Sequence, residues 1–260
     1  MIALGLLLAA ASTAAINGGY ALQHDAAAAL PPLTLRRPVA SLLALFRTPR
    51  WLVGFLGGLV GWMVYVVALR LAPLSLVQAA AAGGVSVLAF GAGRLSRAEW
   101  GGVAAAVGGL ALLAASLGAH TGSARGSAPS VAVWMACSVA VAGIAAVFRD
   151  GLGTAAGVLY AAGDVGTKAA IVGGARLWFV PGLLACHGLA FVALQLAFQR
   201  GRRLATAGVA VLWTNALPIA AGMTLYSESS GGPLRIVAFA LVVLAATALA
   251  RASAPEPAPA

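Results

Sequence analysis

Apolar segments of membrane length fill this 260-residue chain from one end to the other. A helix needs about 20 apolar residues to cross the hydrocarbon core, and its backbone polar groups must be satisfied within the segment. The candidate spans are residues 2–22, 51–70, 73–93, 99–118, 130–148, 151–173, 177–198, 204–226 and 233–250. The sequence therefore predicts an all-α polytopic membrane protein with about nine transmembrane helices.

The composition excludes several other classes of protein. Hydrophobic residues make up 62% of the chain and charged residues 8%, against about 25% charged in soluble domains. The formal charge of +10 is scattered over the loops without interleaved aromatics, so we expect no nucleic-acid partner. Cys137 and Cys186 lie inside apolar segments, which argues against a disulfide or a metal site. We find no nucleotide loop and no nucleophile–base pair, and we expect neither an enzyme nor a cofactor.

The distribution of arginines predicts the orientation. With the N-terminus outside, eleven arginines fall on the inside and four on the outside. The inside set is Arg36, Arg37, Arg47, Arg50, Arg94, Arg97, Arg149, Arg200, Arg202, Arg203 and Arg251, and the outside set is Arg70, Arg125, Arg176 and Arg235. Because basic residues are enriched in cytoplasmic loops, we expect an outside N-terminus and a cytoplasmic C-terminus in the cytoplasmic (inner) membrane.

A weak internal repeat predicts how the chain is organised. Trp51-Leu-Val-Gly opens the second span and Trp178-Phe-Val-Pro the seventh, and Gly61 and Gly188 follow ten residues later. The offset is five spans, so the two halves cross the membrane in opposite senses, as in secondary transporters.

We therefore expect a first repeat over residues 1–118, a linker helix within 119–150, an inverted four-helix repeat over 151–250 and a disordered tail over 251–260. The first repeat includes a segment at 36–50, whose apolar part, residues 38–46, is too short to cross. This segment forms either an interfacial helix or an ordered loop.

Two charged residues lie deep inside the sixth span. Asp164 and Lys168 are one helical turn apart on one face, and a charge at the bilayer centre costs about 2.5–3.5 kcal/mol on insertion scales. They form either a mutual ion pair that neutralises both charges or a polar site in a solute pathway. As a third alternative, Lys168 reaches outward and Asp164 has another partner.

Other polar residues within the spans are candidates for a solute pathway. These are Asn17 and Thr13 in the first helix, Trp213, Thr214 and Asn215 in the eighth, and more weakly Gln78, Gln195 and Tyr160. Interhelical hydrogen bonding is the alternative role of each. Pro218 should free the carbonyl near Thr214. We interpret His187 as an interior histidine with satisfied hydrogen bonds, with a ligand or a proton relay as the alternative.

Several motifs resemble the drug/metabolite transporter superfamily, in its EamA-like and NIPA-like branch. They are Arg47-Thr-Pro-Arg-Trp51, Gly61, Ala68-Leu-Arg-Leu-Ala-Pro-Leu-Ser-Leu-Val-Gln78, Leu95-Ser-Arg-Ala-Glu-Trp-Gly101, Asp164-Val-Gly-Thr-Lys168, Leu217-Pro-Ile-Ala-Ala-Gly222 and Leu225-Tyr-Ser-Glu228. The resemblance covers roughly residues 2–250. It implies inverted repeats and transport of small molecules.

The chain departs from the family pattern in two places. The family often has Pro-Leu after the Val-Gln of the third span, whereas Ala79 and Ala80 follow Gln78 here. A transport pathway for magnesium favours several carboxylate ligands. This chain has one membrane-embedded carboxylate, and a lysine lies beside it, which argues against magnesium transport.

We expect a permease that moves a small metabolite or drug-like solute by alternating access. The pathway residues are Asp164, Lys168, Asn17, Thr167, Trp213, Asn215 and Gln78, and no metal site is expected. A NIPA-like magnesium or cation transporter and a non-transporting membrane scaffold are the alternatives. We expect the partners of the protein to be its small-molecule substrate and the lipid bilayer. Two repeats in one chain are compatible with a monomer, and a homodimer remains open.

Overall fold

The computed structural model describes residues 2–33, 36, 38–81, 84–90, 95–115, 126–148, 150–227 and 233–251. These residues form helices and turns and no strand, which confirms the all-α prediction. The α-helices are α1 (Ile2–Ala28), α2 (Pro38–Phe46), α3 (Pro49–Leu71), α4 (Leu74–Ala81), α5 (Gly84–Phe90), α6 (Arg97–Ala115), α7 (Ala128–Val147), α8 (Leu152–Ala170), α9 (Phe179–Phe198), α10 (Val209–Leu225) and α11 (Leu234–Arg251). The 3₁₀ helix η1 (Gly174–Trp178) leads into α9, and the π-helix η2 (Leu204–Gly208) leads into α10.

Five of the described helices are long and apolar enough to cross a membrane. They are Ile2–Ala28, Pro49–Leu71, Ala128–Val147, Gly174–Phe198 and Leu204–Leu225. The prediction of nine spans is thus met only in part. The span expected at 73–93 contains two short helices, α4 and α5, on either side of residues outside the described set.

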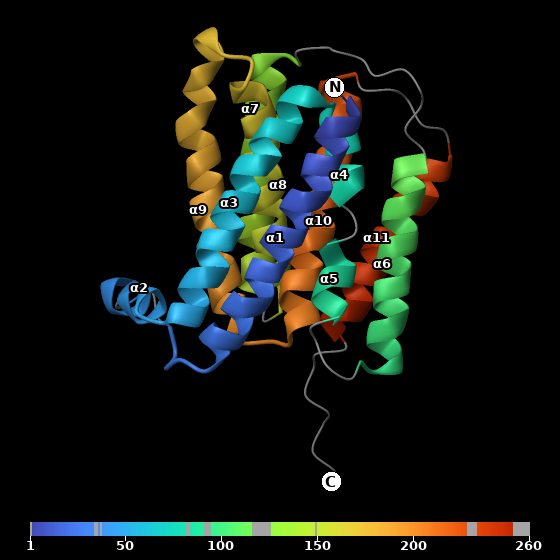
Figure 1. The fold of residues 1–260 in the computed structure, drawn as a ribbon. Coiled ribbons are helices and arrows are strands. Elements are labelled where there is room, and N and C mark those ends of the chain that lie inside the picture. Colours follow the sequence, from blue (N-terminus) through green and yellow to red (C-terminus); the bar gives the residue numbers. More distant parts are fainter. Residues whose placement is uncertain are drawn as a thin grey trace.

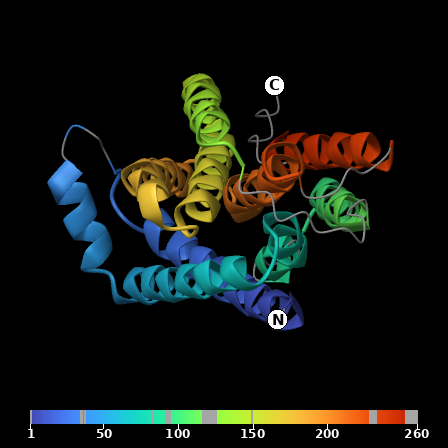
Figure 2. The same ribbon diagram turned by 90° about the horizontal axis from the view of Figure 1, so that it is seen from above.

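Helix α8 lies inside the bundle and packs against α3, α7, α9 and α10 (Figure 2). Sixteen of its 19 residues are buried. Small residues permit this burial: a Cβ added at Gly157 would lie 2.5 Å from the carbonyl oxygen of Ala210, and one at Gly153 would lie 2.9 Å from that of Thr206. Because protein rather than lipid surrounds α8, it can carry polar side chains that a lipid-facing helix would expose.

Helices α1 and α3 pack with their backbones in close contact (Figure 1). A Cβ added at Gly19 would lie 2.5 Å from the carbonyl oxygen of Gly54, and one at Gly54 would lie 2.6 Å from that of Gly19. The Ser12 hydroxyl donates to the Gly61 carbonyl at 2.7 Å. Small residues at such a crossing are typical of membrane helix pairs. The pair forms one wall of the interior described below.

Helices α2, α6 and α11 lie at the edge of the bundle (Figures 1 and 2). Residues 38–46 form the helix α2 rather than a loop, and its position at a membrane interface stays a prediction. Helix α2 lies beside the start of α3. Helices α6 and α11 pack against each other at the opposite side. The expected disordered tail lies outside the described residues, apart from Arg251 at the end of α11.

Candidate functional site

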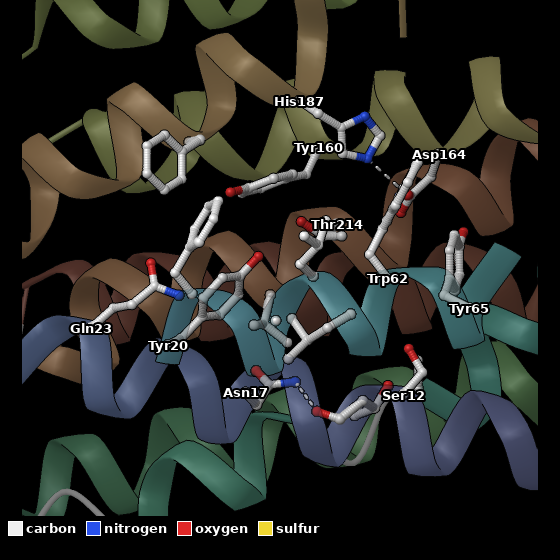
Figure 3. Close-up of a pocket in the computed structure, with 18 of the residues that line it drawn as sticks. Ser12, Asn17, Tyr20, Gln23, Trp62, Tyr65, Tyr160, Asp164, His187 and Thr214 are labelled. Atoms are coloured by element: carbon white, nitrogen blue, oxygen red, sulfur yellow. Dashed lines mark hydrogen bonds and ion pairs between the residues drawn. The ribbon is translucent and has the colours of Figure 1, made fainter. Parts of the chain in front are cut away.

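A cavity of about 500 Å³ lies between the first and second halves of the chain (Figure 3). Helices α1, α3 and α4 form one side of it, and α8, α9 and α10 form the other. The lining polar and aromatic residues are Ser12, Thr13, Asn17, Tyr20, Gln23, Phe46, Phe55, Trp62, Tyr65, Gln78, Tyr160, Asp164, His187, Phe191, Thr214 and Asn215. Both halves therefore contribute hydrogen-bonding groups to one cavity.

Asp164 is the carboxylate that faces this cavity among the described lining residues. Its side chain is 8% exposed. The amide of Gln78, from α4, donates to Asp164 Oδ2 at 3.0 Å and to the Tyr65 hydroxyl at 2.7 Å. Because α3, α4 and α8 supply these groups, the hydrogen bonds join the two halves at the carboxylate.

His187 of α9 approaches the same carboxylate from the other side (Figure 3). Its Nε2 lies 3.5 Å from Asp164 Oδ1, and its Nδ1 lies 2.8 Å from the Leu183 carbonyl oxygen. A carbonyl only accepts hydrogen bonds, so this contact places a proton on Nδ1. Gly163 makes room for the ring, since a Cβ there would lie 2.2 Å from the imidazole.

Lys168 has different partners from those of Asp164. Its Nζ donates to the carbonyl oxygens of Leu69 at 2.9 Å and Ala72 at 3.1 Å. These carbonyls lie at the C-terminal end of α3, where the helix dipole favours a cation. The ion pair recorded for Asp164 is with His187, so the pair expected from the spacing of Asp164 and Lys168 is not the contact that Asp164 makes.

Two buried polar atoms of the cavity wall have no hydrogen-bond partner among the described residues. They are Asn17 Oδ1 and Trp62 Nε1. The Asn17 amide nitrogen donates to the Thr13 carbonyl at 2.9 Å, which leaves the side-chain oxygen available as an acceptor. Buried polar atoms are rarely left unsatisfied in proteins. These two atoms are suited to bind a solute or water.

The cavity brings together four of the seven residues predicted for the pathway. Asp164, Asn17, Gln78 and Asn215 line it. Thr167, Lys168 and Trp213 are not among the described lining residues. The Thr167 hydroxyl donates to the Gly163 carbonyl within α8 at 2.8 Å, and Trp213 packs in the apolar cluster around Ala155 and Leu159.

Aromatic side chains of the wall were not selected from the sequence, except Tyr160 as a weak candidate. The ring of His187 lies 5.6 Å from Trp62 and 5.8 Å from Tyr160, both edge-on. Tyr20 lies 6.2 Å from Tyr160. In a membrane helix, an aromatic residue that faces lipid and one that faces a cavity look alike in sequence, so no pattern singled these out.

Polar contacts between the halves close one end of the cavity, which the orientation prediction places on the cytoplasmic side. Gln195 of α9 accepts from Trp51 Nε1 at 2.9 Å and donates to Gln23 of α1 at 2.8 Å. Further out, the carboxylate of Asp25 pairs with Arg50 and Arg203. These contacts tie α1 and α3 to α9 and to the start of η2.

Comparison with known proteins gives one distant relative. Over 83 residues the chain is 39% identical to the probable magnesium transporter NIPA9 of Arabidopsis thaliana. The match covers 32% of this chain and 24% of the relative, so the similarity concerns a minor part of both. No family model matches the chain, and no solved structure matches it. Together with the apolar helices, this similarity supports an integral membrane protein.

Proposed function

We propose that this protein is a secondary transporter that moves a small solute across the cytoplasmic membrane by alternating access. The observation that carries the proposal is the cavity between the two halves, lined by Asp164, Asn17 and Asn215. Transporters built from inverted repeats hold their solute between the repeats near the bilayer midplane. A scaffold protein has no need for such a cavity, so the cavity favours transport over a structural role.

The helix pairing supports two related halves. Helix α1 packs on α3 as α8 packs on α9, and α4 contacts α1 as α10 contacts α8. In the proposed arrangement each half moves largely as a unit around the cavity. With the N-terminus outside, the contacts of Gln195 and Asp25 close the cytoplasmic end, and opening that end requires them to break.

Uptake into liposomes that contain the purified protein tests the proposal. We expect at least one tracer from a panel of amines, neutral metabolites and anions to accumulate faster than in empty liposomes. Asp164→Asn should reduce that uptake by at least tenfold. Asp150→Asn removes an exposed carboxylate outside the described cavity wall and should leave the uptake unchanged. If no tracer moves in an Asp164-dependent way, the transporter proposal fails.

Magnesium transport is the second candidate, and its support is the similarity to the probable magnesium transporter NIPA9. Magnesium favours octahedral coordination by several oxygens and gives up its water reluctantly. Within the described residues, no cluster of three or more histidine, cysteine or acidic side chains is placed to hold a metal ion. Growth of a magnesium-requiring host at limiting magnesium, with and without the gene, tests this candidate directly.

A further inference from the structure

When His187 is neutral, the Asp164–His187 pair carries a negative charge that no direct contact of the pair compensates. With its Nδ1 proton donated to the Leu183 carbonyl, a neutral His187 presents an unprotonated Nε2 to Asp164 Oδ1 at 3.5 Å. Two acceptors then face each other across a buried contact, which is unfavourable. A proton shared by the pair removes the conflict, and so does a cationic N–H donor that contacts the carboxylate.

Among the described residues, the charged and titratable groups that line the cavity or lie beside the pair do not contact Asp164 with a compensating positive charge. Tyr65 from α3, Tyr20 from α1 and Tyr160 from α8 line the same cavity, and a tyrosine hydroxyl is neutral near neutral pH. Gln78, from α4, donates to Asp164 but carries no charge. The Nζ of Lys168 donates to the carbonyl oxygens of Leu69 and Ala72 at the end of α3.

The rest of the cavity suits a cation that has an apolar body. The rings of Trp62 and Tyr160 both contact the imidazole of His187, and ring faces attract organic ammonium groups. Asn17 Oδ1 is a further acceptor without a partner among the described residues, and it would accept an N–H of a ligand. A cavity of about 500 Å³ is large enough for an aryl-alkyl amine.

One wall of the cavity reaches the outer surface of the bundle. Leu42 and Phe46 of α2, Leu59 of α3 and Leu184 of α9 line the cavity and are also exposed. In a membrane this surface faces lipid, between α3 and α9 and beside α2 (Figure 2). A solute with an apolar body that partitions into the bilayer can enter the cavity from this side, whereas a strongly hydrated ion such as Mg²⁺ cannot.

We propose that the Asp164–His187 pair binds the ammonium group of a protonated, apolar-bodied amine in exchange for a proton. The empty pair holds one proton, and the arriving ammonium displaces it to solvent, so the charge of the site is unchanged. The aromatic residues around His187 hold the apolar body. This inference deepens the proposed transport function and rests on it only for the claim that the bound amine moves.

Binding to the full-length protein in lipid nanodiscs tests the inference, with empty nanodiscs as the background for partitioning. The probes are phenethylamine, its neutral analogue 2-phenylethanol, methylamine and Mg²⁺. We expect saturable binding of phenethylamine at least tenfold tighter than that of the other three. A pH indicator in weak buffer should record about one proton released per amine bound.

Variants of the carboxylate complete the test. Asp164→Asn should weaken phenethylamine binding at least tenfold and abolish proton release, and Asp164→Glu should restore part of both. Asp150→Asn should behave as the unmodified protein, and thermal unfolding in the same nanodiscs should verify that each variant is folded. Equal binding of 2-phenylethanol, amine binding without proton release, or unchanged binding by Asp164→Asn overturns the inference.

Uptake measurements separate this inference from the transport proposal. If liposomes take up a neutral or anionic solute in an Asp164-dependent way and phenethylamine does not bind, transport stands and the amine site is wrong. If phenethylamine binds with proton release but no solute crosses the membrane, the amine site stands and the transport proposal is wrong.

Discussion

Lys168 illustrates how a charged side chain inside an apolar segment can serve the backbone of a neighbouring helix. Its ammonium group donates to two carbonyl oxygens at the end of α3, Leu69 and Ala72. The last carbonyls of any helix have no partner within the helix. The lysine supplies both donors and positive charge at that point.

We expect Lys168→Met to lower the free energy of unfolding in detergent by about 1–2 kcal/mol, because it removes charged hydrogen bonds to carbonyls. Thermal or denaturant unfolding measures this loss. Solute binding at Asp164 should keep its affinity once the folded fraction is taken into account. A loss of affinity as large as that of Asp164→Asn, without loss of stability, would mean that Lys168 acts in the pathway instead.

Gly163 controls the position of His187 relative to Asp164. A Cβ at this residue would lie 2.2 Å from the imidazole ring, so Gly163→Ala must move the ring. We expect at least tenfold weaker amine binding with folding retained, as measured in nanodiscs. Gly143→Ala is the matched control, because a Cβ at Gly143 of α7 meets nothing within 4 Å. Equal affinities of the two variants would show that the ring position is unimportant.

At the scale of elements, the contact between α1 and α3 depends on glycine. A Cβ at Gly54 would lie 2.6 Å from the Gly19 carbonyl oxygen, whereas one at Gly57 on the same helix meets nothing within 4 Å. Helices in lipid associate largely through packing and interhelical hydrogen bonds. Separation of α1 from α3 would also displace Asn17 and Trp62 from the cavity wall.

We expect Gly54→Ala to lower the free energy of unfolding by about 1–3 kcal/mol, since overpacking in a close contact has that cost. Gly57→Ala should change it by less than about 0.5 kcal/mol or stabilise slightly, because alanine favours the helix. Unfolding of both variants in one detergent gives the comparison. Similar losses in the two would show that the close contact at Gly54 is not the cause.

At the scale of the whole molecule, polar contacts between the halves lie at one end of the cavity. Asp25 of α1 pairs with Arg50, at the start of α3, and with Arg203, just before η2. Gln195 joins Trp51 to Gln23 closer to the cavity. Alternating access requires an opening at each end in turn, so these contacts define the closed end of the present state.

We expect Asp25→Asn to increase the population of molecules that are open at this end by up to several-fold. The effect is limited because partly exposed ion pairs contribute about 1 kcal/mol or less. Thr214→Cys, made in a background without Cys137 and Cys186, places a thiol in the cavity wall. Its labelling by a maleimide added from the cytoplasmic side should become faster with Asp25→Asn and stay the same with Asp150→Asn. An unchanged labelling rate would show that Asp25 does not hold this end closed.

The sequence by itself determined the helical class and the membrane setting, because a chain with 62% hydrophobic residues has no other way to satisfy its backbone in lipid. It also marked Asp164, Asn17, Gln78 and Asn215, since polar groups in apolar segments are conspicuous. Segment length alone did not reveal that protein encloses α8.

Only the tertiary structure decided which partners those polar groups have. The spacing of Asp164 and Lys168 on one helical face indicates proximity, but α3 and α9 offer competing partners that no local pattern reveals. The carbonyls of Leu69 and Ala72 hold the lysine, and His187 and Gln78 contact the carboxylate. Because these partners lie far away along the chain, the charge at the centre of the cavity depends on how the two halves meet.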